Sequence, residues 1–389
     1  METKSQIKEM FQKKFNISAE DTRVFYSGGR VNLIGEHTDY NEGYVFPAAL
    51  SLGSYTCIKK RDDRIIRLAA TDLDVVVEAD LDHLLDYKDI KWGKYQLGVI
   101  WEFTKLSDNL CGADILFHDT IPHSGGLSSS AAIQLCCAKA YADLNELKID
   151  NTELAKIARL SENEYIGVQC GVMDQFASAM GKKECAILLN CKTLAFDYIP
   201  LHLGDYRIVI ANTNKKRSLA DSKYNERCAE CAKGLTNLQK VLPGKESLCD
   251  ISPEELSGAI SAISDETIKK RVTHVIVENY RVLDSAKVLQ SGDLEAFGKL
   301  MNDSHASLKD LYEVTGIELD TLAESAQTLP GVLGSRMTGA GFGGCTVSIV
   351  KTDCVDAFCT ELNKIYMDKI GYAPSFYLPD IENGSHEIL

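Results

Sequence analysis

The sequence has no apolar run long enough to span a bilayer, no low-complexity linker and no internal repeat. Positive charge is also scarce, because 42 Lys and Arg residues stand against 56 Asp and Glu residues, for a formal net charge of −14. Proteins that bind nucleic acids in general draw affinity from neutralising many phosphates, so this balance excludes that class. It leaves room for a local basic pocket that binds one nucleotide.

The first residues lack the apolar core of a signal peptide. Instead, Ile7, Met10, Phe11 and Phe15 recur at helical spacing, which predicts an amphipathic helix. We therefore expect a cytoplasmic protein without a membrane partner, working as a monomer.

Thirteen cysteines are an odd number for a disulfide framework, and without an export signal they indicate reduced thiols. Cys228 and Cys231 form a C-x-x-C pair, which is half of a common zinc site. No second pair and no His follows at ligand spacing, and the stretch has a helical pattern. We interpret these two thiols as structural.

A length of 389 residues favours two or three domains, and the pattern is α+β throughout. Branched and apolar runs predict strands at 45–59, 65–70, 75–78, 113–117, 185–189, 207–211, 345–350 and 375–378. Apolar periodicity predicts helices at 92–105, 127–147, 152–166, 220–238 and 355–367, and a helix-rich stretch over 266–301. We place a domain boundary within 189–205, giving domains 1–200 and 201–389. A cleft between them is the default ligand site.

A dense polar cluster stands out in the run from Gly29 to Tyr40, GRVNLIGEHTDY. It places Arg30, Glu36, His37 and Asp39 within ten positions, between glycines that permit sharp turns. Such a cluster makes a poor core and is typical of a site that binds several hydroxyl groups.

A glycine- and serine-rich loop from Pro122 to Ala132, PHSGGLSSSAA, follows a predicted strand and opens a predicted helix. Glycines let the backbone approach an anion, and a helix N-terminus offers unpaired N–H groups. Its hydroxyls can add hydrogen bonds or hold Mg²⁺. Simple N-capping by Ser128 is the plain alternative, but capping needs neither two glycines nor three serines. The usual G-x-x-x-x-G-K-[ST] phosphate loop is absent.

Three further features complete the candidate site. The run TGAGFGG from Thr338 to Gly344 precedes a strand, so it is not a dinucleotide-binding turn, and we expect it to close over a substrate. Asp174 begins an apolar helical stretch and is either a helix-terminal acid or a catalytic base. Glu162 is either a solvated acid or a Mg²⁺ ligand.

These motifs, in this order, resemble the GHMP family of small-molecule kinases over essentially the whole chain. The loop from Gly126 to Ala132 resembles the family's ATP loop, and Met337 to Cys345 its C-terminal glycine motif. The run from Gly29 through Pro47 resembles the signature of the branch that phosphorylates galactose. The resemblance implies a two-domain GHMP-kinase fold, with an N-terminal domain like ribosomal protein S5 and a ferredoxin-like C-terminal domain.

The resemblance also implies roles for individual residues. Asp174 would be the catalytic carboxylate, with Arg30 holding it ionised and stabilising the transferred phosphoryl group. Ser130 and Glu162 would bind Mg²⁺. The sugar contacts would be Glu36, His37, Asp39 and Tyr224. The ATP contacts would be Ser124, Gly125, Gly126, Leu127, Ser128, Ser129, Ser130 and Ala131, with Trp92 and Ser218 near the nucleotide.

Two positions depart from the family's pattern. Ser124 stands where a further glycine is usual, and Ser161-Glu162-Asn163 replaces Ala-Glu-His while keeping the acid. The implied reaction is transfer of a phosphoryl group from ATP, with Mg²⁺, to the anomeric hydroxyl of galactose. Two alternatives stay open: the same chemistry on N-acetylgalactosamine or arabinose, and a non-catalytic sugar sensor. The complete ATP loop and Asp174 favour an enzyme over the sensor.

Overall fold

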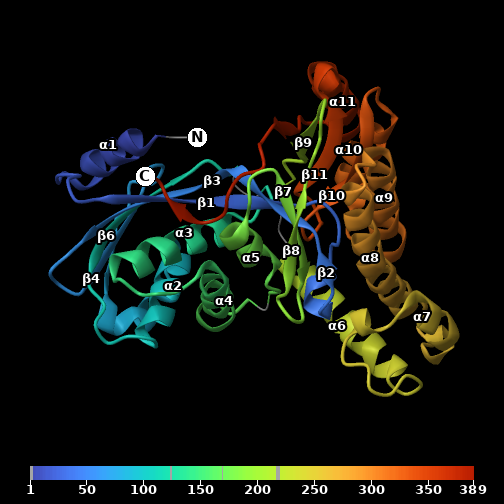
Figure 1. The fold of residues 1–389 in the computed structure, drawn as a ribbon, viewed down its shortest axis with the longest axis horizontal. Coiled ribbons are helices and arrows are strands. Elements are labelled where there is room, and N and C mark those ends of the chain that lie inside the picture. Colours follow the sequence, from blue (N-terminus) through green and yellow to red (C-terminus); the bar gives the residue numbers. More distant parts are fainter. Residues whose placement is uncertain (1–2, 123–124, 169, 216–219) are drawn as a thin grey trace.

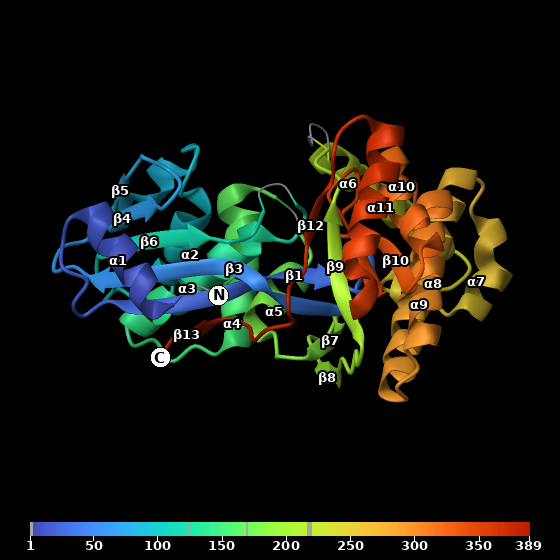
Figure 2. The same cartoon turned by 90° about the horizontal axis from the view of Figure 1, so that it is seen from above.

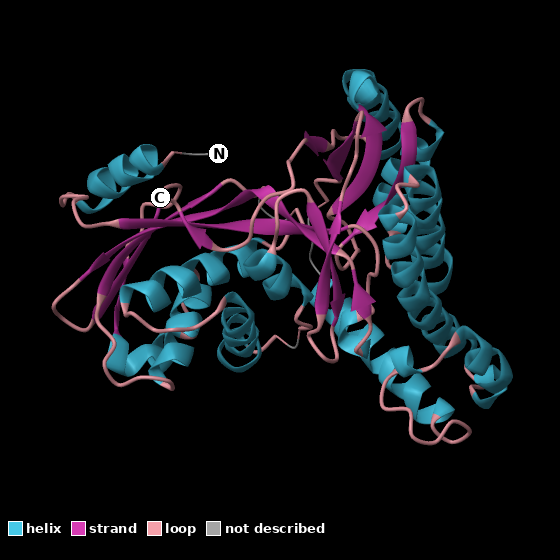
Figure 3. Ribbon diagram, in the orientation of Figure 1, coloured by secondary structure: helices cyan, strands magenta, loops and turns pink. Residues whose placement is uncertain are grey.

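The protein is described here from a computed structural model, which covers residues 3–122, 125–168, 170–215 and 220–389. Its first half is built on a six-stranded sheet and its second half on a four-stranded sheet, with a three-stranded sheet between them (Figures 1 and 3). Long strands of the first half reach across the molecule toward the helices of the second half (Figure 2). The expected α+β architecture is therefore confirmed.

The first sheet has the strand order β13-β1-β3-β6-β4-β5 and is antiparallel except for the β4–β6 pair. Its members are β1 (Arg23–Asn32), β3 (Pro47–Lys60), β4 (Ile65–Ala70), β5 (Val77–Asp80), β6 (Ala113–Asp119) and β13 (His386–Glu387). The register of β1 shifts between Gly28 and Arg30. A Cβ on Gly28 would lie 2.4 Å from the Leu50 carbonyl oxygen, so only glycine permits this close approach.

Helices cover both faces of this sheet, with α1 on one face and α2 to α5 on the other (Figure 1). They are α1 (Lys4–Phe15), α2 (Lys94–Thr104), α3 (Ser129–Leu144), α4 (Asn151–Ser161) and α5 (Met173–Met180). Helix α3 is buried on most sides because its sequence is nearly all small or apolar, with Ala131, Ala132 and Leu135 in its first turns.

The four-stranded sheet has the order β10-β11-β9-β12, which is the order of a ferredoxin-like βαββαβ unit. Its strands are β9 (Tyr206–Asn212), β10 (Val332–Thr338), β11 (Cys345–Lys351) and β12 (Ser375–Tyr377). The helices of this half are α6 (Ala220–Leu238), α7 (Pro253–Ala259), α8 (Glu266–Gln290), α9 (Leu294–Ser307), α10 (Gly316–Thr328) and α11 (Val355–Ile370). The small sheet contains β2 (Tyr44–Val45), β7 (Cys185–Asn190) and β8 (Phe196–Pro200).

Short helical turns join several of these elements. They are the 3₁₀ turns η1 (Asp39–Asn41), η2 (Leu81–Tyr87), η4 (Leu248–Asp250), η5 (Ile260–Ala262) and η7 (Thr352–Cys354), and the π-turns η3 (Glu162–Ile166) and η6 (Leu308–Tyr312). π-turns often occur at functional sites, and η3 begins at one of the predicted site residues.

One hydrophobic cluster joins the two halves. It contains Leu33 and Phe46 from the first half together with Val282, Phe297 and Val347 from the second. The rings of Phe46 and Phe297 meet edge to face, with centroids 6.5 Å apart. The halves therefore share buried apolar surface, which fixes one against the other.

The structure differs from the sequence-based expectations at identifiable places. The strand expected over 45–59 is broken at Phe46 into β2 and β3, and the stretch 266–301 is split by a turn at Gly292, which has φ of +79°. The helix expected over 152–166 ends at Ser161 and continues as η3. Strands β1, β8, β10 and β13 were not expected at all. Their residues include glycines and charged groups that hide the strand pattern.

The division into domains 1–200 and 201–389 stays a prediction. Strand β13, near the C-terminus, pairs with β1 through Phe25↔Glu387 and Tyr26↔His386, so the end of the chain returns to the first sheet.

The described residues bear on two expectations, on membrane-spanning helices and on the state of the cysteines. None of the helices within the described ranges is both long enough and apolar enough to cross a membrane. All thirteen cysteines fall within those ranges and are free thiols. Cys228 and Cys231 lie on α6, as expected, and the Cys231 sulfur contacts the Tyr312 hydroxyl at 3.1 Å.

The shared cluster generates a stability prediction. Phe297→Ala should lower the free energy of unfolding by ~3–5 kcal/mol, because it empties fully buried aromatic volume between the halves. Chemical denaturation followed by circular dichroism measures this change. Tyr280→Ala, on an exposed position of α8, is the control and should cost far less. A similar small cost for both variants would contradict a shared core at Phe297.

Candidate active site

A cavity of about 350 Å³ lies where the two halves meet. Its lining combines the polar run after β1, the glycine- and serine-rich loop, the end of α4, the start of α5, helix α6 and the glycine-rich turn before β11. The residues are Arg30, Glu36, His37, Asp39, Tyr95, Gly126, Ser128, Ser129, Ser130, Glu162, Val168, Cys170, Gly171, Met173, Asp174, Gln175, Tyr224, Gly339 and Ala340. Most of the predicted site residues are thus brought together in one place.

Arg30 and Asp174 form a two-pronged ion pair in the lining of the cavity. Arg30 Nε donates to Asp174 Oδ1 at 2.8 Å, and Arg30 Nη2 donates to Asp174 Oδ2 at 3.0 Å. The guanidinium is buried, while the carboxylate is about one third exposed toward the cavity. A fork of this kind fixes the plane of the carboxylate.

The phosphate-loop candidate follows β6 and opens α3, as the sequence predicts. Gly126 has φ of +72°, and its carbonyl accepts a hydrogen bond of 2.8 Å from Arg30 Nη1. Ser128 adopts φ of 56° and caps no backbone N–H with its side chain, so simple N-capping is wrong. Its hydroxyl instead donates to Asp174 Oδ2. The loop is thereby connected directly to the carboxylate.

The backbone around Arg30 is held by the same loop. The Arg30 N–H donates to the Leu127 carbonyl at 3.1 Å. A Cβ on Gly29 would lie 2.5 Å from that carbonyl oxygen, so glycine is required beside Arg30. The side chains of Leu127 and Ala131 are buried in the core. These two residues can therefore reach a ligand only through their backbone.

Asp39 begins the turn η1 and faces Asp174 across the cavity. Burial, reinforced by the negative charge of Asp174, raises the pKa of Asp39 to about 6. A Cβ on Gly171 would lie 2.0 Å from Asp39 Oδ2, so the missing side chain of Gly171 makes the space that this carboxylate occupies.

Glu162 stands at the start of η3, where α4 changes to a π-turn. Burial and the charge of Asp174 raise the pKa of Glu162 to about 7, and Gln175 donates to Glu162 Oε2 at 2.7 Å. Ser130 lines the same cavity. A buried carboxylate and a hydroxyl in the same cavity fit a hard cation such as Mg²⁺, which takes few protein ligands and completes its shell with phosphate and water. Within the described residues, no group of three or more His, Cys, Asp or Glu side chains could hold a metal ion.

The side chains of Glu36 and His37 each contact residues of the second half. Glu36 accepts a hydrogen bond of 2.9 Å from the Gly339 N–H and forms an ion pair with buried Arg336. Burial lowers the pKa of His37 to about 3, so its ring is neutral at physiological pH.

Aromatic rings gather beside His37 at one side of the cavity. The ring of Tyr224, from α6, lies 5.9 Å from that of His37 and 5.3 Å from that of Tyr40. The Tyr40 hydroxyl is 2.9 Å from His37 Nδ1 and 2.7 Å from the Tyr312 hydroxyl. These contacts bring α6 and η6 of the second half to the polar run of the first.

Not every predicted site residue lines the cavity. Trp92 is partly buried against the hydrophobic core of the first half and is not among the lining residues. Ser124 and Ser218 lie outside the described residues.

Several lining or supporting residues were missed by sequence reasoning. Tyr95 lines the cavity from the first turn of α2, and Gln175 follows Asp174 directly. Arg336 lies inside a strand and is fully buried. An arginine placed just before the glycine-rich turn is the one local signal that could have indicated it.

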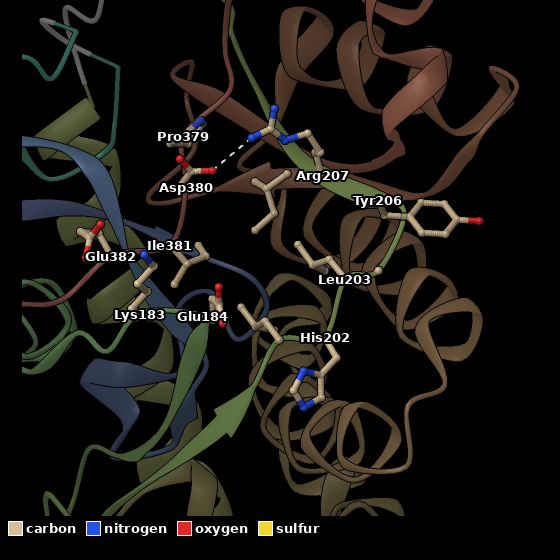
Figure 4. A pocket seen from close by; sticks show the side chains of 13 residues that line it. Lys183, Glu184, His202, Leu203, Tyr206, Arg207, Pro379, Asp380, Ile381 and Glu382 are labelled. Atoms are coloured by element: carbon tan, nitrogen blue, oxygen red, sulfur yellow. Dashed lines mark hydrogen bonds and ion pairs between the residues drawn. The ribbon is translucent and has the colours of Figure 1, made fainter. Parts of the chain in front are cut away.

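A second cavity, of about 540 Å³, lies where the chain crosses between the halves (Figure 4). The Arg207–Asp380 ion pair, at 3.2 Å, borders it, and Lys183, His202 and Glu382 also line it. It shares no lining residue with the first cavity and contains none of the predicted site residues.

Comparison with known families matches three parts of the chain. Residues 9–60 match the galactokinase galactose-binding signature, residues 94–182 the GHMP kinases N terminal domain, and residues 285–366 the GHMP kinases C terminal domain. These ranges contain the polar run, the phosphate-loop candidate with Asp174, and the glycine-rich turn.

Known proteins resemble the chain over its full length. The galactokinases of Clostridium beijerinckii and Clostridium acetobutylicum are 48% and 49% identical to it, each over 100% of both chains. The crystal structure of Lactococcus lactis galactokinase complexed with galactose superposes with a TM-score of 0.94 at 43% identity, covering 98% of this chain and 99% of that one. Methanococcus jannaschii mevalonate kinase, at 22% identity and a TM-score of 0.67, shares the fold.

The expected GHMP-kinase fold and the expected resemblance are therefore both confirmed. Identity of nearly one half across the whole length, together with the signature match at the polar run, shows that this chain belongs to the galactokinase family of the GHMP kinases.

Proposed function

We propose that this protein transfers the γ-phosphoryl group of ATP to the anomeric hydroxyl of α-D-galactose, giving galactose 1-phosphate and ADP. One observation carries the proposal. The Arg30 guanidinium contacts both the Asp174 carboxylate and the Gly126 carbonyl of the phosphate loop, so sugar-side and nucleotide-side groups share one cation. The relatives named galactokinase, and the one crystallised with galactose, support the choice of sugar.

In the proposed reaction the anomeric oxygen attacks the γ-phosphorus, and the bond from that phosphorus to the bridging oxygen of ADP breaks. Asp174 accepts the hydroxyl proton or orients the hydroxyl for attack. Arg30 offsets negative charge on the transferred group, and the backbone N–H groups of the loop from Gly125 to Ala131 hold the phosphates. Positioning and charge stabilisation are the main demands of this chemistry.

Sugar binding is proposed for Asp39 and Tyr224, which face the cavity beside Asp174. We propose that Ser130 and Glu162 would hold Mg²⁺, which would neutralise charge on the ATP phosphates there. One chain provides every role proposed here, which supports a monomer, and we propose that it works in the cytoplasm.

Replacement of Asp174 tests the catalytic assignment. Asp174→Asn keeps the shape of the side chain but removes the charge that faces Arg30, and losing a general base typically costs ~10²–10⁴ in rate. We expect kcat for galactose phosphorylation to fall by that factor, with folding and ATP-analogue affinity largely retained. Coupled measurement of ADP release gives the rate. Near-normal turnover would reduce Asp174 to a helix-terminal acid.

The pH dependence of galactose binding tests the role of Asp39. The pKa of Asp39 is raised to about 6, so the ionised acceptor is present above pH 6 and is lost as the pH falls through that value. Hydrogen bonds to an ionised carboxylate are roughly twice as strong as neutral ones. We expect the KM for galactose to rise below pH 6, with the KM for ATP changing much less.

Asp39→Asn is the matched control for this measurement. It should raise the KM for galactose at all pH values and remove the rise below pH 6. If the variant kept the pH dependence of the native protein, another group would be responsible.

The proposed Mg²⁺ site predicts a proton release. Burial and the charge of Asp174 raise the pKa of Glu162 to about 7, so this carboxyl carries a proton in part of the molecules near neutral pH, and a bound cation would favour the ionised form. Binding of a Mg²⁺–ATP analogue at pH 7 should therefore release a fraction of a proton. Calorimetry in buffers of different ionisation enthalpy measures the number released. Glu162→Gln should abolish this release, and an unchanged value would exclude Glu162 as the source.

A further inference from the structure

Two successive residues of the polar run form hydrogen bonds with the backbone of two successive residues of the glycine-rich turn. Glu36 Oε1 accepts from the Gly339 N–H at 2.9 Å, and His37 Nε2 lies 3.2 Å from the Ala340 carbonyl oxygen. The polar run belongs to the first half of the chain and the turn to the second. The contact therefore crosses the junction of the two halves.

The protonation of His37 follows from its partners. A carbonyl can only accept, so Nε2 carries the ring proton and donates it to Ala340. Nδ1 then accepts from the Tyr40 hydroxyl at 2.9 Å. Both ring nitrogens are engaged with protein groups.

Arg336 holds Glu36 in place for this contact. It lies on β10 and is fully buried, its Nη1 donates to the Asn32 carbonyl at 3.2 Å, and its Nη2 pairs with Glu36. Arg336 is not among the residues that line the cavity. It can affect the reaction only through the groups that it holds.

The glycine-rich turn stands beside the site of phosphoryl transfer. A Cβ on Gly339 would lie 3.2 Å from the Gly126 carbonyl oxygen and 3.8 Å from Arg30 Nη2. Gly339 has φ of +85°, a conformation that favours glycine. The start of the turn is thus packed against both the phosphate loop and the arginine that binds Asp174.

We infer that Glu36, His37 and Arg336 form a clasp that holds Gly339 and Ala340 against the phosphate loop, and that Arg336 is a positioning residue for phosphoryl transfer. This inference deepens the proposed kinase function and rests on it. Glu36 and His37, which the resemblance assigns to the sugar, line the same cavity as Asp39, and the clasp gives them a second role on the nucleotide side. Asp39 lines this cavity as well, and the charge that acts on it most strongly there is that of Asp174.

The test separates nucleotide binding from sugar binding. Affinity for a non-hydrolysable Mg²⁺–ATP analogue is measured by calorimetry without sugar, alongside kcat and the KM for galactose. Hydrogen bonds to charged groups are worth about 1.5–3 kcal/mol, so Arg336→Met and Glu36→Ala should each weaken analogue binding by roughly tenfold to a hundredfold and lower kcat. Asp39→Ala should leave analogue affinity unchanged and raise the KM for galactose.

Two variants separate positioning from mere stability. Arg336→Lys keeps the charge and should recover part of the lost analogue affinity. Arg271→Met is the matched control, because Arg271 is equally buried but pairs with Glu230 and Glu313 away from the cavity. It should lower the melting temperature without changing analogue affinity of the folded protein.

The inference is overturned if Arg336→Met and Glu36→Ala bind the analogue normally and only the KM for galactose rises, since Glu36 would then be a sugar ligand alone. Should Arg336→Met fail to fold, Glu36→Gln provides the same test, because it removes the ion pair while keeping an acceptor for Gly339. Normal analogue affinity in that variant overturns the clasp. A native protein that binds the analogue but does not phosphorylate galactose would overturn the proposed function and leave the clasp standing.

Discussion

The fork between Arg30 and Asp174 is the contact on which the arrangement of the site depends. Arg30 comes from a strand whose register shifts at paired glycines, and Asp174 comes from the first turn of α5, far along the chain. Their meeting requires β1, the phosphate loop and α5 to be placed together. The Leu127 carbonyl accepts a hydrogen bond from the Arg30 backbone N–H, and the Gly126 carbonyl accepts one from Arg30 Nη1. The Ser128 hydroxyl donates to the Asp174 carboxylate.

Carboxylates crowd this cavity, and their mutual repulsion is part of its chemistry. Asp39, Glu162 and Asp174 share one small space in which only Arg30 provides a directly paired cation among the described lining residues. The raised pKa values of Asp39 and Glu162 reflect burial first and the charge of Asp174 second. A polyphosphate would enter such a site only with a compensating cation, which accords with the proposed role for Mg²⁺.

Sequence reasoning found the parts of the site that are local in the chain. The polar run, the loop before α3, Asp174 and the glycine-rich turn are each short motifs, and the structure brings them to one cavity. Arg336 escaped notice because its role depends on a partner 300 positions away, and Tyr95 because a lone tyrosine in an amphipathic helix has no distinguishing neighbour. Strand β1 was missed because its two glycines and Arg30, which make the site, also erase the alternation that predicts a strand.

The return of β13 to the first sheet has a consequence for how the chain reaches its native state. Tyr26 pairs with His386, so one edge of β1 stays without its strand partner until the whole second half has been synthesised. Contacts of such sequence separation slow folding, and an open strand edge invites pairing with other chains. During synthesis this edge of the first sheet therefore stays open to mispairing until the last residues of the chain are made. Chaperone dependence, or yield that falls with expression rate, is the behaviour that this topology favours.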